Sequence, residues 1–212
     1  MQISFLFYEG MTALDAIGPH EILSRLPGVK VSRVALEAGP IFTCSDLVLM
    51  AEHGIADISS TDVLVIPGAG NATSLQEYPE LLAWIHNIHQ TTQWTTSVCT
   101  GSLILGAAGL LTGLQATSHW AVLDRLPRWG AIPVAKRVVE AGKIITAAGV
   151  SAGLDMGFML AAKLAGQEVA ESLQLGLEYD PEPPFNSGSP AKASPALVNA
   201  FRTRLMNKFE NS

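Results

Sequence analysis

Charged residues and cysteines are scarce in this sequence. Asp, Glu, Lys and Arg make up 15% of the 212 residues and hydrophobic residues 48%, so the chain has apolar material for one large core and little sign of disorder. The net charge of −6 argues against nucleic acid or an anionic membrane as the main partner. The two cysteines, Cys44 and Cys99, are too few for a disulfide framework.

Targeting and membrane-spanning patterns are also missing. The first residues, Met1 to Phe7, lack the basic region and the cleavage site of a signal peptide. No apolar run is long and uncharged enough to cross a bilayer. We therefore expect a cytoplasmic protein in which a free thiol stays reduced. The length fits one α/β domain over residues 1–212 and leaves little room for a second.

Strand and helix patterns alternate along the chain. Short apolar runs predict buried parallel strands over Ile3–Tyr8, Val29–Leu36, Val63–Ile66 and Trp94–Val98. We expect helices over residues 14–26, 79–90, 100–111, 151–164 and 168–177, and hairpins near residues 47–50 and over 138–146. This alternation predicts an α/β fold with a mostly parallel sheet and helices on both faces. Ligands of such sheets bind beyond the carboxyl ends of the strands.

Proline marks two places where we expect regular secondary structure to begin or to stop. Pro19 falls within the first helical pattern, and we expect it near the start of that helix, where a missing N–H is tolerated. The stretch from Asp180 to Pro195 is rich in proline and predicts a surface loop. A short helix packed on the domain is expected to follow it up to about Phe209.

Cys99 lies where a strand runs directly into a helix, in Ser97-Val98-Cys99-Thr100-Gly101-Ser102. This pattern is typical of a nucleophile elbow, which presents the side chain at the corner. The unpaired N–H groups of Thr100 and Gly101 and the helix dipole favour a thiolate with a lowered pKa. An inert buried thiol is the alternative, and the local pattern alone does not favour either interpretation.

Two further segments are expected at the same edge of the sheet. Pro67-Gly68-Ala69-Gly70 ends a strand, and its glycines let the backbone approach a ligand, although most such turns are only turns. Asp15 lies in an otherwise apolar stretch, so its carboxyl must be paired, cap a helix or act in the site. If it faces the Cys99 sulfur, desolvation raises its pKa.

Four segments together resemble the ThiJ/PfpI (class I glutamine amidotransferase-like) superfamily, and most of all its isonitrile (isocyanide) hydratases. They are Leu14-Asp15-Ala16-Ile17-Gly18-Pro19, Ser97-Val98-Cys99-Thr100-Gly101-Ser102, Ala116-Thr117-Ser118-His119-Trp120, and the stretch from Glu178 to Pro190. The likeness runs nearly end to end. Cys-Thr-Gly-Ser with an early Asp differs from the protease-like branch, which has His after the cysteine, and from the deglycase branch, which has an early Glu.

The resemblance implies a flavodoxin-like fold and a set of roles. Cys99 is implied as the nucleophile, Asp15 as its acid/base partner, and Thr100 as a third catalytic residue beside the reacting atom. Gly68, Ala69, Gly70 and Gly101 are implied as substrate-binding residues. A homodimer and the absence of a metal or organic cofactor are also implied. The chain departs from its relatives at Ala69, Ala147 and Ala148, where they are often glycine-rich, which bears on pocket size.

The implied reaction is hydration of an isonitrile to an N-substituted formamide. We expect the Cys99 thiolate to attack the isonitrile carbon while protonated Asp15 supplies a proton, giving a covalent thioimidate. The Asp15 carboxylate then activates water. Two alternatives stay open: a stand-alone ligand-sensing module of the transcription-regulator type, or a glyoxalase- or deglycase-like cysteine enzyme. The regulator alternative lacks a basic recognition helix in this sequence.

Other chemically capable residues carry weaker expectations. His119 is more simply a structural histidine than a base for Cys99, and Cys44 is more simply a packing residue. His86 and His89 are expected on a solvated helix face without a metal site. Glu9 and Glu21 are the alternative carboxyls near the first loop. Asp155 is expected to be a helix-face carboxylate.

Overall fold

A seven-stranded sheet in the order β10-β11-β7-β6-β1-β2-β5 forms the centre of the protein. The structure, a computed structural model, describes residues 1–70 and 78–210. All neighbouring strands of this sheet pair in parallel except β10 with β11. The strands are β1 (Gln2–Leu6), β2 (Lys30–Ala35), β5 (His53–Gly54), β6 (Val63–Ile66), β7 (Trp94–Val98), β10 (Val138–Ala141) and β11 (Ile144–Ala147).

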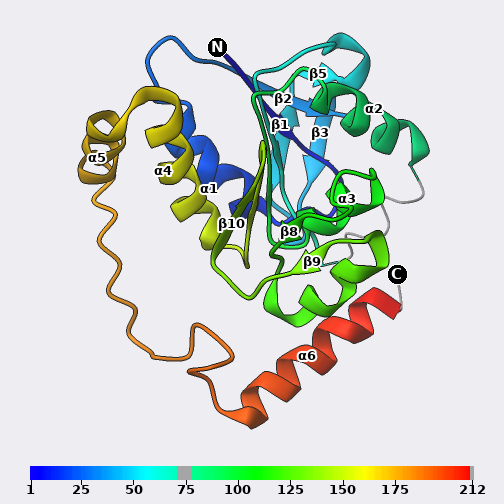
Figure 1. Ribbon diagram of the computed structural model, residues 1–212, viewed down its shortest axis with the longest axis vertical. Coiled ribbons are helices and arrows are strands. Elements are labelled where there is room, and N and C mark those ends of the chain that lie inside the picture. Colours follow the sequence, from blue (N-terminus) through cyan, green and yellow to red (C-terminus); the bar gives the residue numbers. More distant parts are fainter. Residues whose placement is uncertain (71–77, 211–212) are drawn as a thin grey trace.

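Helices cover both faces of this sheet, as the alternation of patterns predicted (Figure 1). On one side lie α1 (Ala13–Leu23), α4 (Ala152–Ala165) and α5 (Gln167–Gly176). On the other lie α2 (Pro79–His89), α3 (Gly101–Ala107) and the 3-10 segment η3 (Trp120–Trp129). Because both faces are covered, the central strands are buried: all four residues of β6 are buried and apolar, and β7 buries Thr95, Thr96 and Ser97. The expected flavodoxin-like α/β fold is confirmed.

Two hairpins and a short strand pair complete the strands. The antiparallel hairpin of β3 (Gly39–Phe42) and β4 (Val48–Ala51) lies beyond β2, and the expected hairpin of β10 and β11 turns at Gly142, whose φ is +61°. The strands β8 (Gln115–Ala116) and β9 (Ile132–Pro133) form a separate parallel pair. A short 3-10 turn, η1 (Ile55–Asp57), follows β5.

Pro19 lies in the interior of α1 and not near its start, so that expectation is wrong. The helix already begins at Ala13, and Pro19 cannot donate to the carbonyl four residues earlier. Close packing on α4 accompanies this loss, since Pro19 is buried and faces two glycines. A Cβ on Gly153 would lie 3.4 Å from Pro19 Cδ, and one on Gly157 would lie 3.4 Å from Pro19 Cα. The two helices therefore touch almost backbone to backbone.

The helix after Cys99 is shorter than expected and ends at Ala107 instead of Leu111. Gly109 adopts a left-handed conformation with φ +78°, which ends the helix. The N–H of Leu110 then donates to the carbonyl of Leu105 at 3.0 Å. The first six residues of the short α3 are nonetheless buried, so its N-terminus lies in the protein interior.

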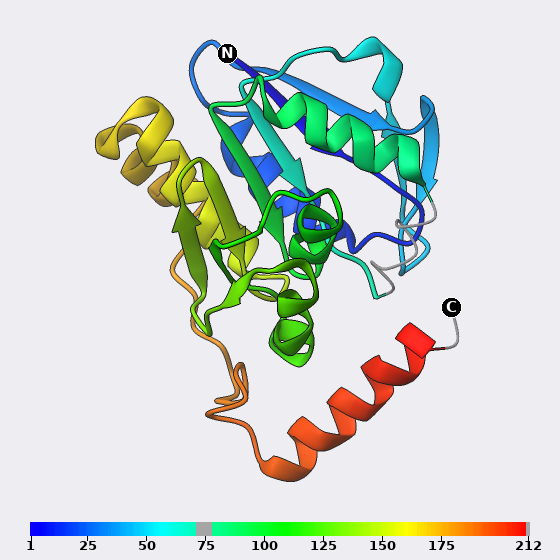
Figure 2. The ribbon, with the colours of Figure 1, turned by 45° about the vertical axis from the view of Figure 1, so that its right-hand side comes forward.

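The last helix, α6 (Pro195–Glu210), stands apart from the other helices. An extended segment over residues 178–194 joins it to α5, in agreement with the expected proline-rich loop (Figure 2). Leu205 and Met206 pack partly buried against the core, and Arg125 Nη2 lies 3.2 Å from Met206 Sδ.

In the described part of the chain, no helix has both the length and the apolar character needed to cross a bilayer.

Candidate active site

Cys99 occupies the corner between β7, which ends at Val98, and α3, which begins at Gly101. Its φ is +60°, a left-handed conformation that is unfavourable for a residue with a side chain. Such strain costs roughly 1–3 kcal/mol and persists only where neighbouring structure holds it. The predicted nucleophile elbow is therefore confirmed, and its strain requires an explanation in the surrounding contacts.

Hydrogen bonds to both peptide groups of Cys99 hold this strained corner. Its N–H donates to the carbonyl oxygens of Ala147 at 3.0 Å and Ala148 at 2.9 Å. Its own carbonyl oxygen accepts from Ser118 Oγ at 3.1 Å and Ser102 Oγ at 3.4 Å. Ser118 belongs to the segment that carried the family resemblance, but sequence reasoning assigned it no role. The structure identifies it as an anchor for the Cys99 backbone.

Asp15 is the third residue of α1, and its side chain is fully buried. Thr12 takes the position before the helix, so the alternative that Asp15 caps it is wrong. Asp15 Oδ2 accepts the Gly68 N–H at 2.8 Å. The Cys99 thiol interacts with the same carboxyl, whereas Oδ1 has no regular hydrogen-bond partner among the described residues. The carboxyl and the thiol are thus neighbours, as the resemblance implied.

Glycine at two positions allows the backbones around this pair to meet. A Cβ on Gly68 would lie 2.5 Å from Thr100 N and 3.0 Å from Asp15 Oδ2. A Cβ on Gly101 would lie 2.5 Å from the carbonyl oxygen of Ile66. The two distances of 2.5 Å to backbone atoms leave no room for a side chain at either position. Gly68 meets the pair directly, while Gly101 packs the start of α3 against the end of β6.

Thr100 ties the elbow to the turn after β6. Its Oγ1 donates to the Ala69 carbonyl oxygen at 2.7 Å and accepts the Ala69 N–H at 2.8 Å. The side chain therefore binds both backbone polar groups of Ala69, one from each of the two peptide units that flank its Cα. Gly70 follows, half-buried, at the edge of the described residues. The substrate-binding roles of Gly68, Ala69, Gly70 and Gly101 stay predictions.

Burial raises the pKa of Asp15 from 3.8 to about 7. The hydrogen bonds from the Gly68 N–H and from the Cys99 thiol act in the opposite direction, because both stabilise the carboxylate. Desolvation outweighs them and is the largest cause of the shift. Asp15 is therefore a carboxyl that exchanges its proton near neutral pH, as we expected from its apolar surroundings.

The pKa of Cys99 is raised, which corrects our expectation of a low-pKa thiolate. Burial is the main cause, and the negative charge of Asp15 adds to it. The N–H groups of Val150 and Thr100 hydrogen bond to the sulfur and lower the pKa, but by less. One of these donors was expected at Thr100, and the other comes from Val150 instead of Gly101. The resting pair is thus a Cys99 thiol that donates to the Asp15 carboxylate.

Tyr8 adds a third titratable group that sequence reasoning missed. Its side chain is buried, and its hydroxyl donates to the Pro67 carbonyl oxygen at 2.9 Å. Burial raises the pKa of Tyr8, and the charges of Asp15 and Cys99 raise it further. Tyr8 lies two residues beyond the end of β1 and belongs to no motif that the sequence showed. It remains a neutral donor that fixes the strand end beside Gly68.

The alternative carboxyls lie elsewhere. The exposed Glu9 carboxylate accepts the N–H of Phe42, with the nearer oxygen at 3.2 Å. Glu21 pairs with Arg25 on the exposed face of α1. Asp155 lies in α4, pairs with Arg137 and also accepts from Tyr179 Oη at 2.6 Å. Asp15 is the carboxyl that reaches the Cys99 thiol.

The other cysteine and the histidines also have defined places. Cys44 is exposed in the turn after β3, so the expectation that it packs in the interior is wrong. His119 Nδ1 accepts the Ala121 N–H at 3.2 Å, which fits a structural histidine. His86 and His89 contact the Ala108 carbonyl oxygen and Thr95 Oγ1. Within the described residues, His, Cys, Asp and Glu form no group of three suited to a metal ion.

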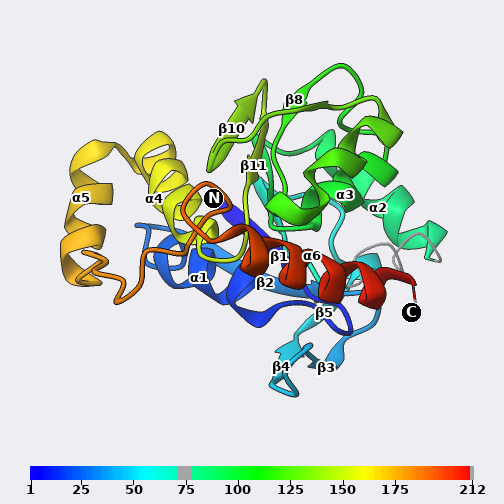
Figure 3. The same ribbon diagram turned by 90° about the horizontal axis from the view of Figure 1, so that it is seen from below.

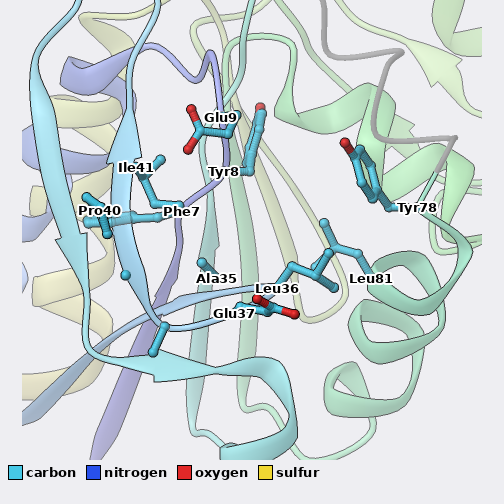
Figure 4. Close-up of a pocket in the computed structure, with 12 residues that line it drawn as sticks. Phe7, Tyr8, Glu9, Ala35, Leu36, Glu37, Pro40, Ile41, Tyr78 and Leu81 are labelled. Atoms are coloured by element: carbon cyan, nitrogen blue, oxygen red, sulfur yellow. The ribbon is translucent and has the colours of Figure 1, made fainter.

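A cavity of about 410 Å³ lies beside the site but does not include the thiol (Figure 4). Tyr8 and Glu9 line one side of it and Tyr78 and Leu81 the opposite side. The Tyr8 hydroxyl bonds away from this cavity to the Pro67 carbonyl. Cys99 and Asp15 are not among the lining residues, so the cavity adjoins the site without containing its chemistry.

Comparison with known proteins places the chain in a family. The sequence profile of the DJ-1/PfpI family matches residues 1–163. The chain belongs to the DJ-1/PfpI family. A crystal structure of a ThiJ/PfpI protein from Pseudomonas syringae superposes with a TM-score of 0.95 at 40% identity, covering 99% of this chain and 87% of that one. This confirms both the suspected family and the fold.

Two proteins similar to this chain differ in what their names describe. The isonitrile hydratase of Pseudomonas putida is 43% identical over 204 residues, which cover 96% of this chain and 90% of that enzyme. The transcriptional regulator CdhR of Pseudomonas aeruginosa is 26% identical over 139 residues, which cover 65% of this chain and 41% of the regulator. The hydratase is thus similar over nearly its whole length and the regulator over less than half.

Replacing Asp15 by Asn tests the raised carboxyl pKa through stability. The folded-state pKa lies above the unfolded value, so the stabilisation from protonated Asp15 is complete below about pH 4 and is lost as the pH rises through about 7. Asn keeps an acceptor for the Gly68 N–H and does not ionise. We expect the Tm of the variant to rise relative to wild type over this range, by the equivalent of a few kcal/mol at most.

Thermal unfolding followed by circular dichroism at several pH values measures this difference. Glu9→Gln is the matched control, because it makes the same change from carboxyl to amide at an exposed position. A Tm difference between Asp15→Asn and wild type that does not change with pH contradicts the raised pKa.

Proposed function

We propose that this protein is an isonitrile hydratase, a cysteine-dependent hydro-lyase that converts a small isonitrile and water to an N-substituted formamide. The buried contact between the Cys99 thiol and the Asp15 carboxyl carries the proposal. Hydration of an isonitrile needs a soft nucleophile for carbon and one group that moves protons, and this pair supplies both. The isonitrile hydratase of Pseudomonas putida, 43% identical, supports the same reaction.

The first step forms a carbon–sulfur bond. The Asp15 carboxylate takes the proton of the Cys99 thiol as the sulfur attacks the terminal isonitrile carbon. Asp15 then delivers that proton to the same carbon, giving a thioimidate, R–N=CH–S–Cys99. This order differs from the one we expected from sequence, in which a thiolate was already present and Asp15 protonated. The raised pKa of the thiol requires the carboxylate to act first as base.

The second step adds water and releases the sulfur. The Asp15 carboxylate removes a proton from water, which attacks the thioimidate carbon, and Asp15 passes this proton to the nitrogen. The tetrahedral adduct then collapses: the carbon–sulfur bond breaks, and the hydroxyl proton of the adduct moves through Asp15 to the sulfur. One isonitrile and one water are consumed and one formamide is formed. The Val150 and Thr100 N–H groups stabilise negative charge on the sulfur in both steps.

We further propose that the chain acts as a single domain and as a homodimer in the cytoplasm. The hairpin of β3 and β4 supports the dimer, because the cross-strand neighbours on one of its faces are all exposed: Pro40, Phe42, Val48 and Met50. Light scattering of the purified protein measures the assembly, and a monomeric mass at micromolar concentration would exclude the dimer.

Replacement of each cysteine separates the nucleophile from a bystander. We expect Cys99→Ala to lower formamide production by about 10³-fold or more, because the covalent intermediate cannot form. Cys44→Ala, which removes the exposed thiol, is expected to retain wild-type activity. Formamide is measured by mass spectrometry with an aryl isonitrile, and methylglyoxal is assayed in parallel. Full activity of Cys99→Ala ends the proposal, and turnover of methylglyoxal alone favours the glyoxalase-like alternative.

The pH dependence of kcat/KM tests the role of Asp15 as base. Because Asp15 ionises at about pH 7, kcat/KM is expected to rise with pH through this value and to level off above it. Asp15→Asn is expected to lose this step together with most of its activity, whereas Glu9→Gln keeps the profile. A rate that is highest at acidic pH and falls through pH 7 would instead require protonated Asp15 in the free enzyme.

A further inference from the structure

The C-terminal helix passes beneath the edge of the sheet that holds Cys99. Seen from below, α6 runs across the molecule under the ends of the central strands (Figure 3). Phe201, half-buried on α6, stacks on His119 with ring centroids 5.8 Å apart and lies 5.6 Å from the ring of Trp120. The Arg202 guanidinium lies over the Trp120 ring at 5.6 Å. These aromatic and cationic contacts fix the middle of α6 to the segment that contains Ser118 and His119.

His119 in turn presses on the glycine before Val150. A Cβ on Gly149 would lie 2.8 Å from His119 Cδ2 and 3.5 Å from Nε2, so the imidazole and the Gly149 backbone are in direct contact. The orientation of the ring is set from its other side, where Nδ1 accepts the Ala121 N–H. Phe201, His119 and Gly149 therefore form one continuous stack from α6 inward.

Val150, the residue after Gly149, connects this stack to the Cys99 sulfur. Val150 follows Gly149 with a φ of +21°, a conformation that a β-branched residue adopts only when its surroundings impose it. In this conformation its N–H donates to the Cys99 sulfur. Ser118, which precedes His119, donates to the Cys99 carbonyl oxygen at 3.1 Å. His119 thus lies between two hydrogen bonds to the nucleophile, although it does not itself touch the sulfur.

We propose that Phe201 and His119 are positioning residues through which α6 sets the reactivity of Cys99. Phe201 holds the His119 ring against Gly149, and this contact keeps the Val150 N–H directed at the sulfur. A backbone donor at the sulfur stabilises the developing thiolate, so its loss makes the thiol harder to ionise and slower to react. The inference concerns the nucleophile itself and does not depend on which electrophile is its substrate.

Alkylation by iodoacetamide tests this in the full-length protein without any isonitrile. All variants carry Cys44→Ala, so that the exposed thiol does not contribute. Phe201→Ala removes the stack, and Phe201→Tyr keeps a ring in place. His119→Asn removes the imidazole but retains a side chain that caps the Ala121 N–H. Leu197→Ala is the matched control on α6, since Leu197 is 51% exposed and lies one turn before Phe201. Thermal unfolding verifies that each variant is folded.

We expect Phe201→Ala and His119→Asn each to slow alkylation of Cys99 by roughly 3–10-fold at neutral pH, as for loss of one hydrogen bond. The pH midpoint of alkylation is expected to rise in both. The double variant is expected to be no slower than the slower single variant, because both changes break the same stack. Phe201→Tyr and Leu197→Ala are expected to react like the parent.

Four outcomes overturn the inference. Unchanged alkylation in both single variants shows that the stack does not act on the sulfur. Additive effects show that Phe201 does not act through His119. An equal loss in Leu197→Ala shows that any disturbance of α6 suffices. Faster alkylation in Phe201→Ala shows that α6 only shields the thiol.

Discussion

A single proton shared between a thiol and a carboxyl in a water-poor space is the constraint around which this site is built. Burial makes either anion costly, and two adjacent anions costlier still, so the pair Cys99 and Asp15 holds two protons below about pH 7 and one proton, on the sulfur, above it. In the proposed reaction, this proton moves from the sulfur through Asp15 to the isonitrile carbon as the first bond forms. The Asp15 carboxyl then serves as both base and acid, and the proposal needs no further acid beside the pair.

The topology of the sheet explains how four distant segments meet at that proton. Four neighbouring parallel strands, β11, β7, β6 and β1, each end beside the site. Val150 follows β11, Cys99 follows β7, Gly68 follows β6, and Asp15 follows β1 at the start of its helix. Each segment contributes one element: an N–H to the sulfur, the sulfur, an N–H to the carboxylate, and the carboxylate. The strand ends lie side by side, and the backbones that follow them meet closely because Gly68 and Gly101 have no side chains.

The sequence predicted the parts of this site that depend on one segment at a time. The strand, the corner and the helix around Cys99 follow from local pattern, as does the buried carboxyl of Asp15 in apolar surroundings. The direction of the shift in the pKa of the Cys99 thiol was not predicted. It depends on how deeply the corner is buried and on the charge of Asp15, which lies 84 positions away in the chain. Val150 was missed because it acts through its backbone, which no side-chain pattern reveals. Pro19 was misplaced because packing against Gly153 and Gly157 overrides its local helix penalty.

Contacts outside the site can affect the reactivity of Cys99, because they hold the residues that bond to it. The elbow at Cys99 is strained, and strain persists only while its neighbours hold it. Ser118, which holds the Cys99 backbone, and Val150, which donates to the sulfur, lie on either side of His119, and the outer face of His119 meets α6. A small displacement of that helix therefore changes the donors at the sulfur before it disturbs the sheet.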